Sequence, residues 1–483
     1  MSDLTTDQEV KSDKNGQGSV AAGARAFGVA DPLAQPSSHD LLALARRVAA
    51  QAQPGEQIEA YVARGLSTQV KAYGGEVESL TSAESFGVGI RVIADHRQGF
   101  AHAGTFDESV IAETLAEARD NASFGEQDEW FGLADPDGVE PIDQDLWRDG
   151  LAEFAPQRKV DLALALEQAV LGRDPRVTGV RTAVYADSSG EGAVASSAGV
   201  AAYGRGTSCW LSVSALAEHG GETKIGGGID VGREPSELDV EVAAIDAVDK
   251  AVRLFGAKPV PSQRLAIVLE PRMAASIVGL AGGTLTGERV LKGRSPFADR
   301  LGEVIASPLL TLLDDPTNPA SLAAESHDGE GLACRPNQLI VDGELRQFLH
   351  NAYTARRAGV TSTGSAVRGY RSTPGVGCQA LSIAPGSGTH DELIAGVELG
   401  LLVDSMSGFH SGVNAVSGDF SVGAEGIMIR NGQLAEPVRE VTIASTLQRL
   451  LLGIEAVGAD LEWLPGGTGS VTLVIGDVSL SGT

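Results

Sequence analysis

Cysteine is scarce in this chain of 483 residues. Only Cys209, Cys334 and Cys378 occur, and no two of them form a CxxC pair. Cysteines this few and this far apart exclude a disulfide framework and a zinc site built from thiolates. They are typical of a protein kept in a reducing compartment, so the sequence predicts a cytoplasmic location.

Basic residues are also few. The chain has 37 lysines and arginines but 64 aspartates and glutamates, which gives a formal net charge of −27. Most of the surface would repel a polyanion, so nucleic acid is not an expected partner. Aromatic residues make up only 5% of the chain, whereas 61 residues are glycine. This is nearly twice the usual glycine share of about 7%, and it predicts many turns and close backbone contacts.

Long apolar runs are lacking as well. No stretch approaches the roughly 18 residues that a membrane-spanning helix requires, so we expect no contact with a membrane. Residues 1–37 are polar, rich in glycine, serine and alanine, and without the apolar core of a signal peptide. The sequence therefore predicts a disordered N-terminal tail at 1–37.

No complete catalytic motif is found. GGTLTGER places Gly282 and Gly287 at the spacing of a phosphate loop, but Glu288 stands where that loop needs lysine. The chain has no GxSxG elbow, and the neighbouring His410 and Ser411 are expected to point apart. The eight histidines include no pair at the helical spacing that binds catalytic zinc. These motifs alone therefore predict no enzyme mechanism.

The apolar pattern predicts an α+β fold. A helix with one apolar face starts near Ser38. Four short, partly alternating segments between residues 58 and 94 predict an antiparallel meander. Thr105 and Glu108 then have the spacing of a capping box at the start of a second helix.

Two prolines in the segment AKPVPSQ predict a linker at residues 257–263. Before the linker we expect an N-terminal α+β domain at 38–256, with an antiparallel sheet and two modules at about 38–130 and 150–256. After it we expect a mostly β, barrel-like C-terminal domain at 264–483.

Two turn signals support a sheet-rich C-terminal domain. Asp342-Gly343 lies between the apolar runs of LIVDGELRQF, and Asn431-Gly432 lies between those of IMIRNGQLAE. Asp-Gly and Asn-Gly favour tight hairpin turns, because both turn residues need a positive φ. We therefore expect a β-hairpin at each position.

Four long segments resemble the TldD/PmbA family, and specifically its TldE (PmbA) branch. They are SFGVGIRVIADHRQGFAHAGTFD, SPFADRLGEVIASPLLTLLDDPT, NAYTARRAGVTSTGSA and GVNAVSGDFSVGAEGIMIRNGQLAEPVREVTIA. The resemblance runs from about Leu80 to the C-terminus and so covers most of the chain. It implies a cytosolic heterodimer that cleaves small or modified peptides, with zinc on an HExxxH helix and a later cysteine in the TldD subunit.

The resemblance also implies that this chain is the subunit without metal. By this resemblance, the two histidines and the glutamate of HExxxH correspond to Gly279, Thr284 and Leu280, none of which is expected to bind zinc or act as a base. The later cysteine is missing too, because the last cysteine is Cys378. We therefore expect no cofactor and no catalytic residue in this chain, and zinc in a TldD-like partner.

Two segments are candidates for contact with a peptide or with the partner. The stretch 410–426 is dense in glycine and serine, so it can approach a peptide backbone, or its glycines can serve tight turns only. The segment 350–359 carries an arginine pair that can clamp a carboxylate or form an exposed helix end. The candidate contact residues are Asn351, Tyr353, Arg356, Arg357, His410, Asn414, Ser417, Asp419 and Ser421.

Two other functions are compatible with the sequence. The chain can be a self-associating peptide-binding or scaffold protein that never meets a protease, and mass measurement in a cell extract distinguishes this from a heterodimer. It can also be a hydrolase with an unrecognised nucleophile, which an electrophilic probe would label. The sequence names neither the peptide nor the pathway.

Overall fold

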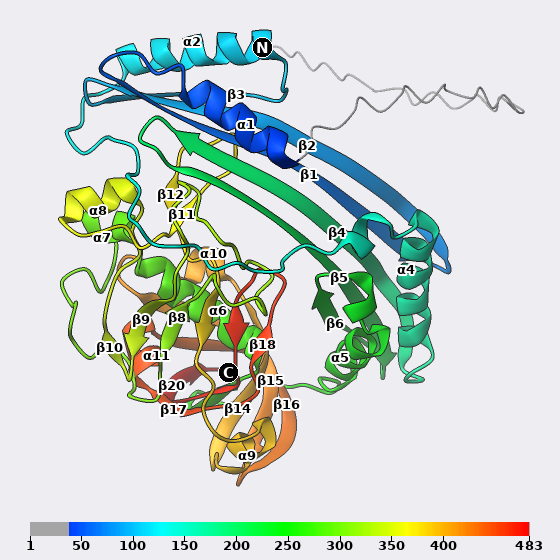
Figure 1. Ribbon diagram of the computed structural model, residues 1–483. Coiled ribbons are helices and arrows are strands. Elements are labelled where there is room, and N and C mark those ends of the chain that lie inside the picture. Colours follow the sequence, from blue (N-terminus) through cyan, green and yellow to red (C-terminus); the bar gives the residue numbers. More distant parts are fainter. Residues whose placement is uncertain (1–37, 483) are drawn as a thin grey trace, which may run out of the picture. The chain divides into compact units, whose positions relative to one another are not determined.

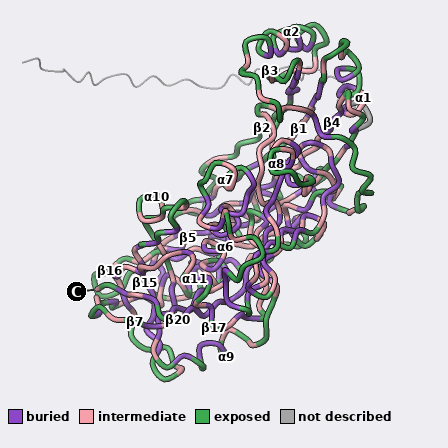
Figure 2. The backbone as a smooth tube through the Cα atoms, turned by 90° about the vertical axis from the view of Figure 1, so that its left-hand side faces the viewer, coloured by how far each residue is buried: buried purple, intermediate pink, exposed green. Residues whose placement is uncertain are grey.

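The computed structural model describes residues 38–482, so the tail predicted at 1–37 lies outside the described residues (Figure 1). The described part is a mixed α+β structure, as predicted, with three six-stranded sheets and one two-stranded sheet. Buried residues form three main clusters: one between the first sheet and the helices within residues 38–124, one between that sheet and the helices within residues 156–252, and one in the C-terminal part (Figure 2).

The first sheet is an antiparallel half-barrel in the order β3-β2-β1-β4-β5-β6. Its strands are β1 (Glu56–Tyr73), β2 (Glu76–Ala94), β3 (Arg97–Ala103), β4 (Val177–Ser196), β5 (Ala201–His219) and β6 (Glu222–Gly232). The two modules expected at about 38–130 and 150–256 share this sheet, because β1 of the first pairs with β4 of the second.

The strands β1 and β2 are longer than the sequence pattern predicts. The four short segments expected between residues 58 and 94 are two strands of 18 and 19 residues, joined by a turn at Gly74-Gly75. In β2, residues 76–86 are exposed apart from the half-buried Ser79. A strand that is exposed on both faces shows no apolar alternation, which is why the pattern underestimates its length.

Four helices cover one face of this sheet: α1 (Ser38–Ala49), α2 (Glu108–Phe124), α4 (Pro156–Leu171) and α5 (Val240–Val252). The pair α1 and α2 lies over one end of the long strands and the pair α4 and α5 over the other (Figure 1). Ile58 packs with the first pair and Val70 with the second. Because these residues are an even number of positions apart on β1, both pairs cover the same face.

The start of α2 differs from the prediction. Asp107 is its N-cap, and the carboxylate accepts hydrogen bonds from the backbone N–H groups of Ser109 at 2.9 Å and Val110 at 3.2 Å. The predicted cap, Thr105, instead accepts a hydrogen bond from the Asp107 N–H at 3.1 Å. Aspartate is at least as good an N-cap as threonine, so the helix begins later than predicted, at Glu108.

The C-terminal part contains a closed five-stranded barrel, which confirms the predicted architecture. The ring runs β16-β15-β14-β7-β20 and closes through pairing of β20 with β16, while β17 extends it. The strands are β7 (Gln263–Leu269), β14 (Leu399–Ser407), β15 (Asp419–Arg430), β16 (Gln433–Thr446), β17 (Ile454–Val457) and β20 (Leu473–Ser481).

Smaller elements surround the barrel. A sheet in the order β10-β9-β8-β13-β19-β18 consists of β8 (Leu312–Asp314), β9 (Asn337–Val341), β10 (Glu344–Leu345), β13 (Leu381–Ile383), β18 (Glu462–Trp463) and β19 (Gly469–Ser470). The two-stranded sheet pairs β11 (Ala366–Val367) with β12 (Gly375–Val376).

The remaining helices are short, apart from α6. They are α3 (Asp149–Ala152), the 3₁₀ turn η1 (Pro235–Glu237), α6 (Pro271–Thr284), α7 (Gly287–Leu291), α8 (Ala352–Ala358), α9 (His390–Ala395), α10 (Phe409–Gly412) and α11 (Leu447–Leu452). Within residues 38–482, no helix is long and apolar enough to cross a membrane.

Both predicted hairpin turns are present. Asp342 and Gly343 connect β9 to β10 with φ values of 49° and 81°. Asn431 and Gly432 connect β15 to β16 with φ values of 51° and 75°. Positive φ at both turn residues is the geometry for which these dipeptides are favoured.

The face of the first sheet without helices packs on the C-terminal part through the Glu59 cluster, which comprises Glu59, Arg91, Glu330 and Arg368. Arg91 Nη2 donates to Glu59 Oε2 at 2.8 Å and to Glu330 Oε1 at 3.3 Å, and Arg368 also donates to Glu59. Burial opposes ionisation of Glu59, but Arg91 and Arg368 outweigh it and hold its pKa below the usual value. The cluster therefore joins the two parts by buried charge pairs.

Candidate functional site

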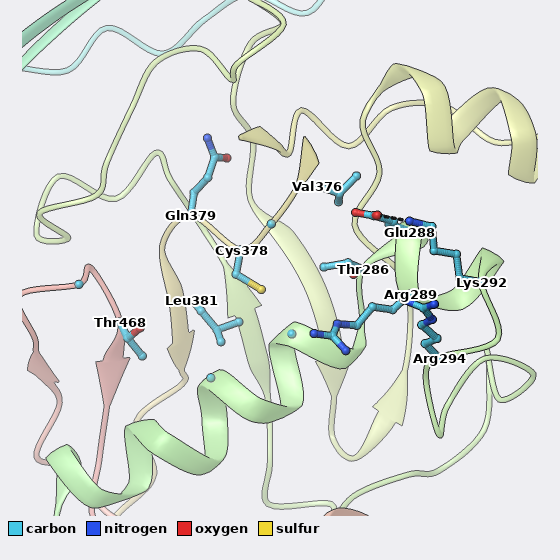
Figure 3. Close-up of a pocket in the computed structure, with 14 residues that line it drawn as sticks. Thr286, Glu288, Arg289, Lys292, Arg294, Val376, Cys378, Gln379, Leu381 and Thr468 are labelled. Carbon is cyan, nitrogen blue, oxygen red and sulfur yellow. Dashed lines mark hydrogen bonds and ion pairs between the residues drawn. The ribbon is translucent and has the colours of Figure 1, made fainter. Parts of the chain in front are cut away.

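The structure contains two cavities that are large enough to bind a ligand. The sheet cavity, of about 890 Å³, lies between the first sheet and the loop 322–329. The α6 cavity, of about 480 Å³, lies beside α6 (Figure 3). Cys378 and Gln379 belong to both walls. Both volumes are within the range of about 300 to 1,000 Å³ that small-ligand pockets occupy.

The sheet cavity is lined by strand backbone and by a few large polar side chains. Tyr61 of β1 lies under Arg368, whose Cζ is 5.1 Å from the centre of the phenol ring. Gly190 of β4 and Gly204 of β5 also line it, and no atom lies within 4 Å of the position of a Cβ at either. Glycine therefore widens this cavity and lets a ligand approach the strand backbone.

Titratable groups of the loop 322–329 also line the sheet cavity. Burial lowers the pKa of His327 below its usual value, and its Nδ1 has no hydrogen-bond partner among the described residues. Burial, reinforced by the charge of Glu330, raises the pKa of Asp328 to about 7, although backbone N–H groups oppose this. Because its pKa is lowered, His327 is a neutral imidazole at pH 7 and its ring can make a hydrogen bond.

Helix α6 presents the three positions that the resemblance assigns to zinc ligands and a base. Gly279 is exposed in the α6 cavity, and Leu280 packs against the C-terminal core. Thr284 is fully buried, and its hydroxyl donates to the Ala281 carbonyl at 2.7 Å. Within residues 38–482, no group of three or more His, Cys, Asp or Glu side chains is arranged to hold a metal ion. The described residues therefore do not fit a catalytic zinc.

Asp314, at the end of β8, fixes the wall segment that the two cavities share. Its Oδ1 accepts the backbone N–H groups of Gln379 and Ala380, both at 2.8 Å. Its Oδ2 is buried without a hydrogen-bond partner among the described residues. Burial raises the pKa of this carboxyl to about 6, even though the two N–H groups favour the charged form.

The predicted residues at the start of α8 are engaged within the chain. Asn351 is the N-cap of α8, and its Oδ1 accepts the Thr354 N–H at 2.9 Å. The Tyr353 hydroxyl donates to Asp128 Oδ2 at 2.8 Å, and its ring packs against Phe131. Both side chains thus have structural contacts, and neither residue lines the two cavities.

The two predicted arginines differ from each other. Arg356 donates to the carbonyls of Trp130 at 3.2 Å, Gly132 at 3.0 Å and Leu133, so it ties α8 to a distant loop. Arg357 is exposed, and its Nη1 donates to the Tyr353 hydroxyl at 3.2 Å. Neither lines the cavities, and contact with a partner or peptide stays a prediction for both.

The glycine-rich stretch 410–426 folds tightly on itself. A Cβ on Gly412 would lie 1.8 Å from the Ser421 carbonyl oxygen, so packing within the chain requires glycine there. The loop is closed by its own polar groups, since Asn414 Oδ1 accepts the Val416 N–H at 2.9 Å. The predicted side chains in this stretch are all exposed and lie outside the two cavities: His410, Asn414, Ser417, Asp419 and Ser421.

The structure brings together residues that the sequence interpretation did not select. Arg289, Lys292 and Arg294 line the α6 cavity, and Tyr61, Arg205 and His327 line the sheet cavity. The sequence does indicate the first group, because three basic residues occur within six positions of a strongly acidic chain. The second group had no such signal, because its members meet only through the fold.

The sequence matches three consecutive family domains. Residues 58–122 match PmbA/TldA metallopeptidase domain 1, residues 149–255 match the central domain, and residues 262–482 match the C-terminal domain. The Metalloprotease PmbA of Escherichia coli O157:H7 is 28% identical, over 84% of this chain and 88% of its own length. A Metalloprotease TldD homolog of Haemophilus influenzae is 26% identical, over 82% and 87%.

Solved structures show the same fold. The crystal structure of TldE from Thermococcus kodakarensis superposes with a TM-score of 0.84 and 23% sequence identity, and the match covers 92% of this chain and all of that one. At this identity the likeness concerns the fold alone.

Proposed function

This chain belongs to the PmbA/TldD metallopeptidase family, and we propose that it is the TldE-like, non-catalytic subunit of a two-subunit zinc peptidase in the cytoplasm. In this proposal a TldD-like partner carries zinc on an HExxxH helix and cleaves small or modified peptides. The present chain forms part of the cleft that holds the peptide.

The side chains of α6 carry this proposal. Catalytic zinc is bound by three protein ligands, usually histidine, carboxylate or thiolate groups. Gly279 offers no side chain, Leu280 offers only carbon atoms, and the Thr284 hydroxyl is buried and already bonded to a carbonyl. In this member of a metallopeptidase family, α6 therefore supplies no zinc ligand at these three positions.

Exposed apolar side chains on the first sheet support a protein partner. Val77 of β2 lies opposite the buried Ala72 of β1, and Leu80 lies opposite the buried Val70, so both point to the helix-covered face. Both side chains nevertheless remain largely exposed, Val77 at 41% and Leu80 at 48%. Grouped exposed apolar side chains mark interaction sites, and we assign this one to the TldD-like subunit.

Co-expression with a family member that contains HExxxH tests the proposal. We expect the two chains to co-purify, and a casein-derived peptide mixture to be cleaved by the pair but by neither chain alone. Leu80→Glu should weaken co-purification, because it places a charge in the interface. Leu434→Glu is the matched control, since Leu434 is 50% exposed on β16, in the other part of the chain.

Two results would count against this function. Cleavage by the present chain alone, abolished by Ser411→Ala, would assign it a nucleophile of its own. A stable homodimer that binds no HExxxH-containing chain would favour the scaffold function instead.

A further inference from the structure

The α6 cavity is positively charged in a protein whose net charge is −27. Arg289, Lys292 and Arg294 all line it, and Glu288 is the one acidic side chain in its wall. Glu288 pairs with Lys292 Nζ at 2.5 Å, as the dashed line in Figure 3 shows. The charges of the two guanidinium groups therefore remain uncompensated within the cavity.

A local turn holds the backbones of these two arginines close together. Gly293 has a φ of 61°, and the turn brings the Arg294 N–H to the Arg289 carbonyl at 2.8 Å. Neither guanidinium group has a hydrogen bond or ion pair with another described residue. Figure 3 shows the Arg289 side chain extended toward the last turn of α6, whereas Arg294 lies further from that helix. Two like charges in the wall of one cavity repel each other, and an anion bound in that cavity would reduce this cost.

The walls of the cavity leave room for a chain that carries such an anion. Gly279 and Gly283 lie one turn apart on α6, and no atom lies within 4 Å of a Cβ built on either. Packing within the protein does not require glycine there, although glycine destabilises a helix relative to alanine. On the other side lies Val376 of β12, a strand that pairs only with β11 among the described strands. The Gly375 carbonyl of this strand already accepts the Asn351 Nδ2 at 3.3 Å, so Val376 is the position of β12 that can meet an extended ligand.

We infer that the α6 cavity binds the acidic end of a peptide. Arg289 and Arg294 hold its carboxylate groups, because guanidinium groups bind carboxylates with paired, directional hydrogen bonds. The peptide backbone runs between the glycine face of α6 and the edge of β12. That the ligand is a peptide rests on the proposed function, whereas the affinity for carboxylates rests on the cavity itself.

Peptide binding to the purified full chain, without a partner, tests the inference. The probe is a fluorescein-labelled alanine hexapeptide that ends in two glutamates and a free carboxylate, measured by fluorescence anisotropy. The comparison peptide ends in two glutamines and an amide. We expect the acidic peptide to bind at least about tenfold more tightly, a difference typical of charge-assisted hydrogen bonds.

Three variants locate the binding site. Arg289→Gln combined with Arg294→Gln should weaken binding of the acidic peptide by about tenfold or more. Arg181→Gln is the matched control, because Arg181 is an exposed arginine of β4 outside both cavities. Gly283→Leu keeps every charge and fills the cavity, so it should abolish binding while the thermal midpoint stays at or above that of the wild type.

Equal binding of the two peptides would overturn the inference, and so would wild-type affinity in the double arginine variant. Inorganic phosphate is added as a competitor. If it bound as tightly as the acidic peptide, the cavity would be a site for a small inorganic anion and the peptide assignment would be wrong. Co-purification with an HExxxH partner does not depend on these results, so a failure here is distinct from a failure of the proposed function.

Discussion

At the scale of single residues, Arg356 joins segments that are far apart in the sequence. Its guanidinium donates to three carbonyls of the segment 130–133. Arg356→Ala should therefore lower the free energy of unfolding by about 2 kcal/mol, the range for hydrogen bonds from charged groups. Arg357→Ala should change it by less than about 0.5 kcal/mol, because that side chain is exposed. Urea denaturation measures both, and equal losses would contradict the role given to Arg356.

Asp314 makes stability depend on pH. Burial raises its pKa to about 6 from the usual 3.8, so the folded protein holds this proton more tightly than the unfolded chain. The resulting stabilisation is complete below about pH 4 and is lost as the pH rises through about 6. The full difference corresponds to about 3 kcal/mol.

Asp314→Asn isolates this effect. Asparagine stays neutral and keeps an oxygen for the N–H groups of Gln379 and Ala380. Between pH 4 and pH 7, titration of Asp314 should lower the free energy of unfolding of the wild type by up to about 3 kcal/mol. The variant should not show this loss. Urea titrations at several pH values provide the comparison, and parallel curves for the two proteins would show that Asp314 titrates normally.

At the scale of elements, the glycines serve two different purposes. Gly279 lies inside α6 with open space at its Cβ position, whereas a Cβ on Gly412 would clash with the Ser421 carbonyl. Gly279→Ala should stabilise the protein by up to about 1 kcal/mol through helix propensity. Gly412→Ala should destabilise it by more than about 1 kcal/mol, because the loop must move. Thermal unfolding distinguishes the two, and shifts of the same sign would refute the distinction.

The elements also show how far a sequence predicts this structure. The fold class and the hairpins at Asp342-Gly343 and Asn431-Gly432 follow from local rules, and the structure confirms them. The length of β2 does not follow from such rules, because residues 76–86 are exposed on both faces of the sheet. The α6 cavity could not be predicted either, since residues 279–294 and 376–379 meet only after the chain has folded. For the stretch 410–426, a role in binding a peptide or a partner stays a prediction.

At the scale of the whole molecule, the Glu59 cluster holds the first sheet against the C-terminal part. Glu59→Gln leaves Arg91 and Arg368 without their shared carboxylate. Removal of one partner of a buried ion pair costs about 3 to 5 kcal/mol, so we expect a loss of this size in urea denaturation. Glu303→Gln, which removes the exposed partner of Arg300, should cost less than about 1 kcal/mol. A Glu59 variant as stable as this control would show that other contacts hold the two parts together.

Zinc content tests most directly whether this chain is the subunit without metal. The full chain, purified alone and dialysed against metal-free buffer, is measured by elemental mass spectrometry. We expect far less than one zinc per chain, because Gly279, Leu280 and Thr284 provide no ligands. About one zinc retained per chain would contradict it, and would mean that side chains such as His327, His350 or His410 build a metal site of their own.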